Sequence, residues 1–379
     1  MASSISGQIA KQVGEAVKRA ADERRSSWWF SRHMAAASRA VSERIPLVDL
    51  LLHVRDARIP LSSECQGLHG GRFQSKTVVV LNKMDLANSS QTKEWVKHFE
   101  MQNCHCFAVN AHNSDNIKQF LNYLQARLRE LKKSDYPNFT ATIMLVGIPN
   151  VGKSALANSL HKIGRISAAE KGKLKHTVVS PDPCETKDIR SLKIASRPNV
   201  YVLDTPGILP PSISDIDICS KLALTGAISD HLVGVKELAQ YFLSVLNSSE
   251  EYRKWEKLLP RRNDCLVIDS PGVSTSGSHL ETKKIRRHPS DHTQDFIVQD
   301  VRRTLFEEIS SHQSSQDVND SMQLIGTEMT ALREAFRISL DSEEESCLRV
   351  SQKLLDLYRT GRLGHYTLDN VPDLYHAHQ

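Results

Sequence analysis

One short stretch, GIPNVGKS at residues 147–154, restricts what this chain can fold into more than any other. It satisfies G-x-x-x-x-G-K-[ST] and stands between the apolar run ATIMLV and the helix-like SALANSLHKI, the context that a phosphate-binding loop requires. Glycines let backbone amides approach phosphates, and the helix N-terminus adds its dipole. We expect Lys153 to reach the β and γ phosphates and the Ser154 hydroxyl to bind Mg²⁺.

A second motif, VYVLDTPG at 200–207, directs Asp204 toward Mg²⁺ and the Gly207 amide toward the γ-phosphate. CLVIDSPG at 265–272 is similar, but it follows the end of the strand pattern, so Asp204 is preferred to Asp269 as the metal ligand. Between the phosphate loop and Asp204, Thr186 is the candidate for the switch threonine that binds Mg²⁺, with Thr177 as the alternative.

A base-reading motif precedes the phosphate loop. TVVVLNKMD at 77–85 places Asn82, Lys83 and Asp85 after an apolar run. The Asp85 carboxylate can accept hydrogen bonds from guanine N1–H and the exocyclic amine, which adenine does not present together. Asn82 would brace the loop, and the stem of Lys83 would cover one face of the base. The next strand candidate ends at NAHN, where Asn110, Ala111 and His112 could offer backbone contacts to guanine. These motifs favour GTP and GDP over ATP.

Strand candidates alternate with amphipathic stretches from residue 47 to 208. The strand candidates are LVDLLLHV, TVVVLN, CFAVN, ATIMLVG and VYVLD. This pattern predicts an α/β fold with a largely parallel sheet and helices on both faces, whose polar turns converge at the carboxyl ends of the strands. Because domain termini often lie close together, a sheet with rotated strand order can bring the same loops to one site. We therefore predict a circularly permuted P-loop GTPase domain over 28–214.

Helical spacing dominates after DTPGILPPSIS, and predicts a mostly helical C-terminal domain over 215–379 with a flexible insertion near 269–294. Residues 1–27 place Ile5, Ile9, Val13 and Val17 four apart, which predicts an amphipathic extension. A transit segment and a helix packed on the domain are the two interpretations, because acidic residues are unusual in transit segments.

Composition excludes some classes. With 40% hydrophobic residues we find no apolar run of the roughly 18 residues that a transmembrane segment needs. Seven scattered cysteines indicate a reducing compartment rather than a disulfide framework. The net charge of +5 is compatible with an RNA partner, for which KKIRRH at 283–288 and RTGRLGH at 359–365 are the candidate basic stretches.

Four further stretches complete a resemblance to the circularly permuted YlqF/RbgA family of GTPases and its mitochondrial branch, the DAR GTPases of plants and their animal relatives. They are WWFSRHM at 28–34, VRDARIPLSS at 54–63, LALTGAI at 222–228 and YRTGRLGHYTLD at 358–369. The resemblance implies GTP hydrolysis, slow alone and stimulated by the ribosome, in maturation of the large ribosomal subunit. It also implies rRNA and ribosomal proteins as partners, and a mitochondrial matrix location, with cytosol and chloroplast as alternatives. Peripheral association with the inner membrane is expected.

The resemblance assigns site residues to each group of the nucleotide. The base is assigned Asn82, Lys83 and Asp85; the phosphates are assigned Gly147, Asn150, Val151, Gly152, Lys153, Ser154 and Ala155; the switch, Mg²⁺ and γ-phosphate are assigned Thr186, Asp204 and Gly207. Asn150 matches an asparagine that helps to hold K⁺ in related GTPases.

Ile208 follows DTPG where Ras-like GTPases carry a water-orienting glutamine. His33 matches a histidine that the family uses near this water, although Ser31 and Arg32 replace the Pro-Gly usual before it. Cys184 replaces a glycine usual before Thr186. Two alternatives therefore stay open: a GTP-regulated ribosome- or RNA-binding scaffold with negligible hydrolysis, and an ATP-dependent phosphotransferase.

Overall fold

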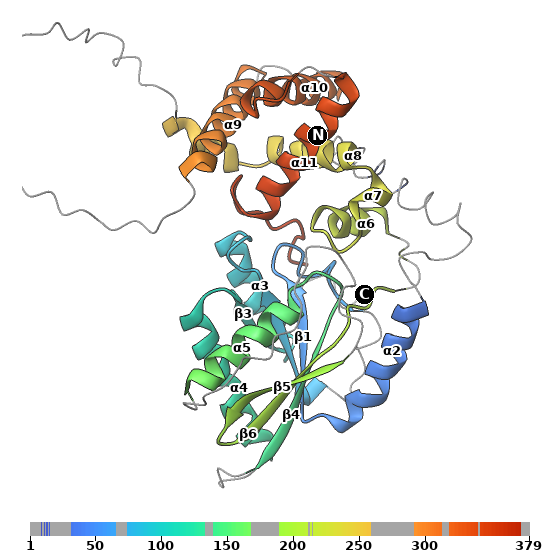
Figure 1. Cartoon of the computed structure of the whole chain (residues 1–379), viewed down its shortest axis with the longest axis vertical. Coiled ribbons are helices and arrows are strands. Elements are labelled where there is room, and N and C mark those ends of the chain that lie inside the picture. Colours follow the sequence, from blue (N-terminus) through green and yellow to red (C-terminus); the bar gives the residue numbers. More distant parts are fainter. Residues whose placement is uncertain are drawn as a thin grey trace, which may run out of the picture.

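The computed structural model describes residues 9, 11, 13, 15, 32–65, 74–132, 139–167, 189–210, 213, 215–258, 292–312, 318–339 and 342–372. Within them, six strands form one sheet in the order β3-β2-β1-β4-β6-β5 (Figure 1). The strands are β1 (Leu50–Asp56), β2 (Thr77–Asn82), β3 (His105–Val109), β4 (Thr140–Val146), β5 (Arg190–Ser196) and β6 (Asn199–Asp204). Neighbouring strands pair in parallel except β5 and β6, which are antiparallel. The predicted largely parallel sheet is confirmed.

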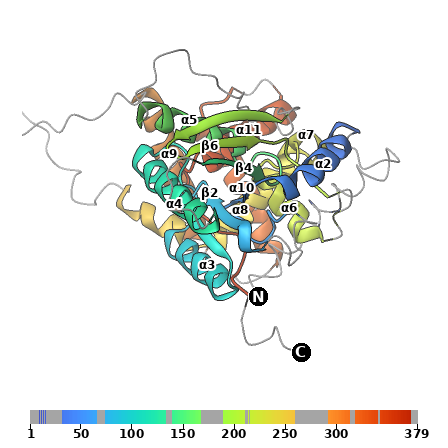
Figure 2. The ribbon, with the colours of Figure 1, turned by 90° about the horizontal axis from the view of Figure 1, so that it is seen from below.

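Helices cover both faces of this sheet, as expected for strands that are apolar on both sides. On one face α4 (Ser114–Lys132) and α5 (Lys153–Ser167) pack on the side chains of β1 and β4. On the other face α2 (Arg32–Arg44) packs on Leu51 and Met144, and α3 (Ser89–Met101) places Trp95 on Val79 and Leu81. Figure 2 shows α4 and α5 on one side of the strands and α2 on the other.

The strand order explains the rotated motifs. The phosphate-loop strand β4 lies in the middle, between β1 and β6, and β2 carries the base-reading motif two positions away. Because these strands are parallel, the turns after β2, β4 and β6 reach the same edge of the sheet. A chain that meets the base-reading motif first therefore still assembles one site.

Among the elements that the sequence interpretation missed are the strand β5, the helix α2 and a short 3-10 helix before β1. β5 has only Leu192, Ile194 and Ala195 as buried apolar residues, and it pairs on one side only. Leu47, expected in the first strand, ends a 3-10 helix, η1 (Ile45–Leu47), and is 79% exposed. Strand β5 and helix η1 lie at the margins of the sheet, where burial on two faces no longer constrains the sequence.

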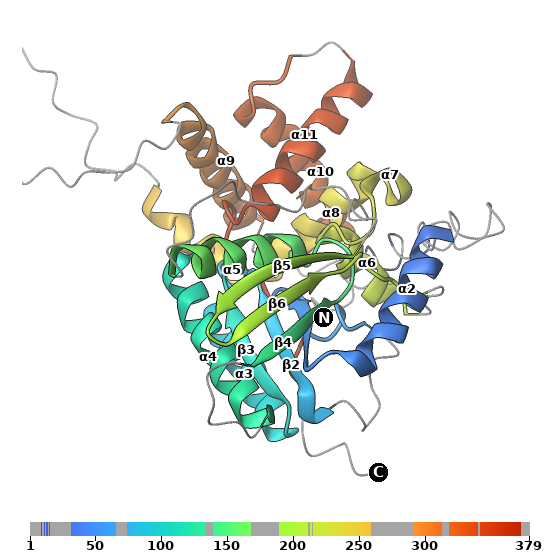
Figure 3. The same cartoon turned by 60° about the horizontal axis from the view of Figure 1, so that its bottom comes forward.

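The helical region follows the sheet and lies above it in Figures 1 and 3. It contains α6 (Ile216–Leu224), α7 (Asp230–Val233), α8 (Val235–Asn247), the 3-10 helix η3 (Glu251–Leu258), α9 (His292–Ser311), α10 (Val318–Ala335) and α11 (Glu343–Arg359). The predicted insertion, 269–294, extends too far along the sequence, because residues 292–294 are the first three residues of α9. Its other residues, 269–291, lie outside the described part of the chain.

At the N-terminus, Ile9 and Val13 are buried in the same apolar cluster as Met34, while Lys11 and Glu15 are exposed. These positions follow the predicted amphipathic stripe; Ile5 and Val17 lie outside the described residues. Among the described helices, none combines the length and hydropathy that crossing a membrane demands.

Glu328, on α10, gives the helical region a testable pH dependence. It is fully buried, and Asn247 Nδ2 donates a hydrogen bond to its Oε2 at 3.1 Å. Burial raises the pKa of Glu328 from an ordinary 4.5 to about 8, with the Glu308 charge adding to the rise. The folded chain therefore keeps a proton that the unfolded chain releases. This group's contribution to the free energy of unfolding should fall by up to about 1.4 kcal/mol per pH unit as pH rises from about 5 to 8.

Glu328→Gln removes this titration and keeps the side-chain shape, so we expect a higher Tm than wild type at pH 8 and a smaller difference at pH 5. Thermal unfolding at both pH values checks this, with Glu344→Gln on exposed helix surface as the control. Equal pH dependence in wild type and Glu328→Gln would contradict the prediction.

Candidate nucleotide-binding site

The phosphate loop has the geometry that its two outer glycines predict. Gly147 and Gly152 both have positive φ, +155° and +88°. A Cβ at Gly147 would lie 2.3 Å from the Val54 carbonyl oxygen, and one at Gly152 would lie 2.4 Å from Asn82 Nδ2. Only glycine fits at either position. Across the loop, buried Lys153 donates through Nζ to the carbonyls of Gly147 at 3.1 Å and Ile148 at 2.8 Å.

Two predicted Mg²⁺ ligands meet at the end of this loop. Ser154 Oγ donates to Asp204 Oδ2 at 2.7 Å, and Asp204 is fully buried at the end of β6. A hydroxyl and a carboxylate in contact beside a phosphate loop suit Mg²⁺, which prefers oxygen ligands. Gly207 lies against the loop, because a Cβ there would be 2.5 Å from Pro149 Cα, and Ile208 N donates to the Gly147 carbonyl at 3.2 Å. The DTPG turn and the phosphate loop are therefore in direct contact.

Ser154→Ala tests this pair. Loss of the hydroxyl removes one metal ligand, so GTP hydrolysis should need at least about tenfold more Mg²⁺ for half-maximal rate. Ser154→Thr, which keeps the hydroxyl, is the matched control and should titrate like wild type. An unchanged Mg²⁺ titration in Ser154→Ala would remove Ser154 from the metal site.

The base-reading motif is joined to the phosphate loop by its own side chains. Buried Asn82 donates through Nδ2 to the Val151 carbonyl at 2.8 Å, so it braces the phosphate loop. Lys83 has a left-handed φ of 60° and donates through Nζ to the Asn150 carbonyl. Each of these two residues thus holds part of the phosphate loop.

A cavity of about 420 Å³ lies beside these residues. Its lining includes Asp85, Ala111, His112, Gly152 and Ala155, which combines the base-reading motif, the turn after β3 and the phosphate loop. Asn110 is not among the residues that line the cavity. Its Oδ1 accepts a hydrogen bond from the His112 amide at 2.8 Å, so its side chain shapes the turn. The residues predicted to contact the base and those predicted to contact the phosphates therefore converge.

The DAR segment, VRDARIPLSS at 54–63, contacts the base-reading motif through residues to which the sequence interpretation gave no role. Arg58 donates to both carboxylate oxygens of Asp56, at 3.0 and 2.8 Å, and Lys83 Nζ lies 3.2 Å from Asp56 Oδ2. Burial would raise the pKa of the Asp56 carboxyl, but the charges of Arg58 and Lys83 outweigh it and hold this pKa below its ordinary value. Burial also lowers the pKa of Lys83, against the opposing effect of Asp56. Asp56 therefore fixes the lysine of the base-reading motif.

The helical region contacts the phosphate loop and the DAR segment. Asn150 donates through Nδ2 to the Gly226 carbonyl at 3.3 Å, and the Arg58 guanidinium lies 5.6 Å from the centroid of the Tyr358 ring. The Asp369 carboxylate accepts hydrogen bonds from the backbone amides of Leu61 at 2.8 Å and Ser62 at 2.7 Å. Asp369 therefore caps the DAR segment. These contacts come from LALTGAI and YRTGRLGHYTLD, two of the stretches that carried the family resemblance.

Arg359 has a different role from the one expected. Its guanidinium donates to both carboxylate oxygens of Asp230, each at 2.7 Å, and to the Ala223 and Leu224 carbonyls at 3.1 Å. It therefore joins helices inside the protein, and the prediction that RTGRLGH forms an RNA-facing basic stretch is weakened at this residue. KKIRRH lies outside the described residues.

The remaining candidates of the sequence analysis lie outside the described residues or at the start of α2. Thr186, Thr177, Cys184 and Asp269 lie outside the described residues. His33 is the second residue of α2, and the next residue, Met34, accepts at Sδ from the Leu209 amide at 3.3 Å. The start of α2 therefore lies against the segment that follows DTPG.

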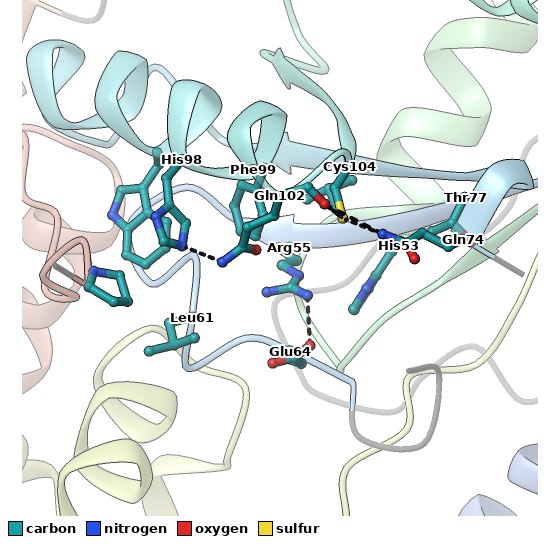
Figure 4. Close-up of a pocket in the computed structure, with 13 residues that line it drawn as sticks. His53, Arg55, Leu61, Glu64, Gln74, Thr77, His98, Phe99, Gln102 and Cys104 are labelled. Carbon is teal, nitrogen blue, oxygen red and sulfur yellow. Dashed lines mark hydrogen bonds and ion pairs between the residues drawn. The ribbon is translucent and has the colours of Figure 1, made fainter. Parts of the chain in front are cut away.

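A second cavity, of about 590 Å³, lies on the face of the sheet covered by α3 (Figure 4). His53, Arg55 and Val79 of the sheet line it together with His98 and Phe99 of α3. The Arg55 guanidinium points toward Glu64 and donates to its Oε1 at 2.8 Å and to the Pro60 carbonyl at 3.0 Å. Because Glu64 compensates the charge of this buried cation, Arg55 is poorly suited to binding phosphates.

The chain is similar in sequence to several known GTPases. Residues 142–259, which include the phosphate loop and Asp204 but not the base-reading motif, match the family described as 50S ribosome-binding GTPase. The mitochondrial DAR GTPase 2 of Arabidopsis thaliana is 54% identical, over 99% of this chain and 98% of its own length. Short integuments 2, mitochondrial, of the same plant is 39% identical, over 91% and 89%. Ribosome biogenesis GTPase A of Bacillus pumilus is 30% identical, over 73% of this chain and 95% of its own length.

Proposed function

The chain belongs to the circularly permuted GTPase family that includes mitochondrial DAR GTPase 2 and ribosome biogenesis GTPase A, and we propose that it is a GTP-hydrolysing assembly factor for the mitochondrial large ribosomal subunit. The observation that carries this proposal is the hydrogen bond from Asn82 to the Val151 carbonyl. It joins a guanine-reading loop to a phosphate loop in the rotated order. The relatives' names supply the ribosomal setting. A permuted GTPase domain over 28–214 and a helical domain over 215–379 are the proposed boundaries.

Each part of the site has a proposed role. Asp85 accepts hydrogen bonds from guanine, with Ala111 beside the base; Lys153 and the amides of the phosphate loop bind the β and γ phosphates. Ser154, Asp204 and Thr186 would hold Mg²⁺, which neutralises charge on the transferred phosphoryl group. The Gly207 amide contacts the γ-phosphate.

The attacking water needs a group other than glutamine, because Ile208 follows DTPG. We propose His33 for this role, supported by the contact of neighbouring Met34 with Leu209. Asn150 is the proposed K⁺ ligand: its Nδ2 is engaged by Gly226, which assigns the cation to Oδ1.

A scaffold with negligible hydrolysis is the second candidate, favoured by Ile208 alone. Multiple-turnover GTP hydrolysis with purified mitochondrial large subunits, in K⁺ and then in Na⁺, separates the two. An assembly GTPase should be stimulated well above its free rate, while Lys153→Ala should not be stimulated. No stimulation by any large-subunit preparation would favour the scaffold.

Location in the mitochondrial matrix, with peripheral contact to the inner membrane, is also proposed, and rests on the mitochondrial relatives and the amphipathic extension. A fusion of residues 1–40 to a fluorescent protein should be imported, and carbonate extraction of the full chain should release it from membranes. A diffuse cytosolic signal or a chloroplast signal would count against import through this segment.

A further inference from the structure

The cavity beside Asp85 has a wall from each region of the protein. One side comes from the GTPase motifs, and the other is formed by Asp356, Arg359 and Thr360 at the end of α11. No motif for base or phosphate binding predicts a contribution from this helix. A nucleotide in the cavity would therefore touch both regions.

The end of α11 is held firmly enough to act as a wall. Arg359 anchors it to Asp230 through two hydrogen bonds and to the end of α6 through two more. The turn that follows packs on the base-reading loop, because a Cβ at Gly361 would lie 2.9 Å from Leu86 Cδ2. Leu86 is the residue after Asp85, so the end of α11 is positioned by the helical region and by the base-reading loop.

The Asp356 carboxylate is a charged group on this wall with unused hydrogen-bonding capacity. Its backbone carbonyl accepts from the Thr360 amide at 3.0 Å and from Thr360 Oγ1 at 2.7 Å. Among the described residues, neither a hydrogen bond nor an ion pair engages its carboxylate. An exposed carboxylate on a cavity wall can only accept hydrogen bonds and repels anions.

The chemistry of a guanine nucleotide then selects the partner of this carboxylate. Its hydrogen-bond donors are N1–H and the exocyclic amine of the base, and the 2′ and 3′ hydroxyls of the ribose. Asp85 takes the first two, and the phosphates are anions that a carboxylate repels. The ribose hydroxyls are the donors that remain, and an acidic side chain on a ribose hydroxyl is a known arrangement at dinucleotide sites.

We propose that the Asp356 carboxylate accepts a hydrogen bond from a ribose hydroxyl of the bound guanine nucleotide, so that the helical region completes the nucleotide site. This rests on the proposed function only in that the cavity binds GDP or GTP. It makes Asp356 a specificity-determining residue for ribonucleotides, and it makes nucleotide binding tighten the contact between the two regions.

Calorimetric titration of the full chain with GDP, 2′-deoxy-GDP and 3′-deoxy-GDP tests the proposal. Wild type should prefer GDP to at least one deoxy nucleotide by about tenfold or more, the size expected for a hydrogen bond to a charged group. In Asp356→Ala this ratio should fall close to one, and in Asp356→Asn, which keeps an acceptor, it should be intermediate. Gln352→Ala, one turn earlier on exposed surface, is the matched control and should keep the wild-type ratio.

The ratio of GDP affinity to deoxy-GDP affinity distinguishes a direct contact of Asp356 with the ribose from a structural effect of the substitution. If Asp356→Ala weakens GDP and both deoxy nucleotides equally, or if wild type does not discriminate among them, the proposal is overturned. Binding of GDP by wild type in that experiment would leave the proposed GTPase function standing. Failure to bind GDP at all would overturn both, and melting curves of each variant identify loss of folding.

Discussion

Asp85→Asn is expected to weaken GDP binding by about a thousandfold or more and to turn the site toward xanthosine diphosphate. The carboxylate would pair with two donors of guanine, and a base that covers this exposed carboxylate without pairing with it binds at a cost. Xanthine carries a carbonyl where guanine carries the amine, so an asparagine amide can donate where the carboxylate accepted. Calorimetric titration with both nucleotides, for wild type and variant, measures the exchange of preference.

Asp115→Asn is the matched control. Asp115 lies near the turn after β3, with its side chain 85% exposed and paired to Lys118, and it does not line the cavity. It should bind GDP like wild type. The assignment of Asp85 as the base-reading residue would be refuted by unchanged GDP affinity in Asp85→Asn, or by equal losses for both nucleotides.

Arg58→Ala is expected to lower the free energy of unfolding by about 3–5 kcal/mol. Arg58 and Asp56 are almost fully buried, and removing one partner of a buried ion pair leaves the other charge poorly compensated. The stacking on Tyr358 is lost as well. Because Asp56 also fixes Lys83, GDP affinity should fall together with stability. Chemical denaturation and GDP titration measure the two effects.

Two controls define what is special about this ion pair. Arg349→Ala removes a partner from the exposed pair with Glu345 and should change stability by less than about 0.5 kcal/mol. Arg58→Lys keeps the charge but loses the two-pronged geometry, so it should be intermediate. A change below about 1 kcal/mol for Arg58→Ala would mean that the pair is not the stabilising element that its burial indicates.

Much of the sheet and site could be predicted from sequence because their residues are constrained locally. Strand β2 is a buried parallel strand, so its apolar run has the bounds Thr77–Asn82 in both the sequence and the structure. Lys153, Ser154 and Asp204 are fixed by motif spacing, and the Ser154–Asp204 contact confirms that the two motifs meet.

The remaining features depend on contacts between distant segments. Asp56 and Arg58 are recognisable as letters of a motif, but their roles come from Lys83 and Tyr358, which no spacing rule connects to them. In the sequence, RTGRLGH resembles a solvated basic stretch. Only the fold shows that Asp230, far from it in the sequence, pairs with Arg359. Asp356 carries no motif at all, and only the packing of α11 brings it to the cavity.

The capping of the DAR segment has a consequence for the order of folding. Asp369 joins amides that precede it by 308 and 307 positions in the sequence. Contacts over such separations form late, because the entropy of closing a long loop must be overcome first. During synthesis the strands of the sheet can pair before α11 has left the ribosome, but the Arg58 side of the site cannot close. We therefore expect a nascent chain to hold nucleotide firmly only after its helical region has been made, so that nucleotide retention reports completed folding.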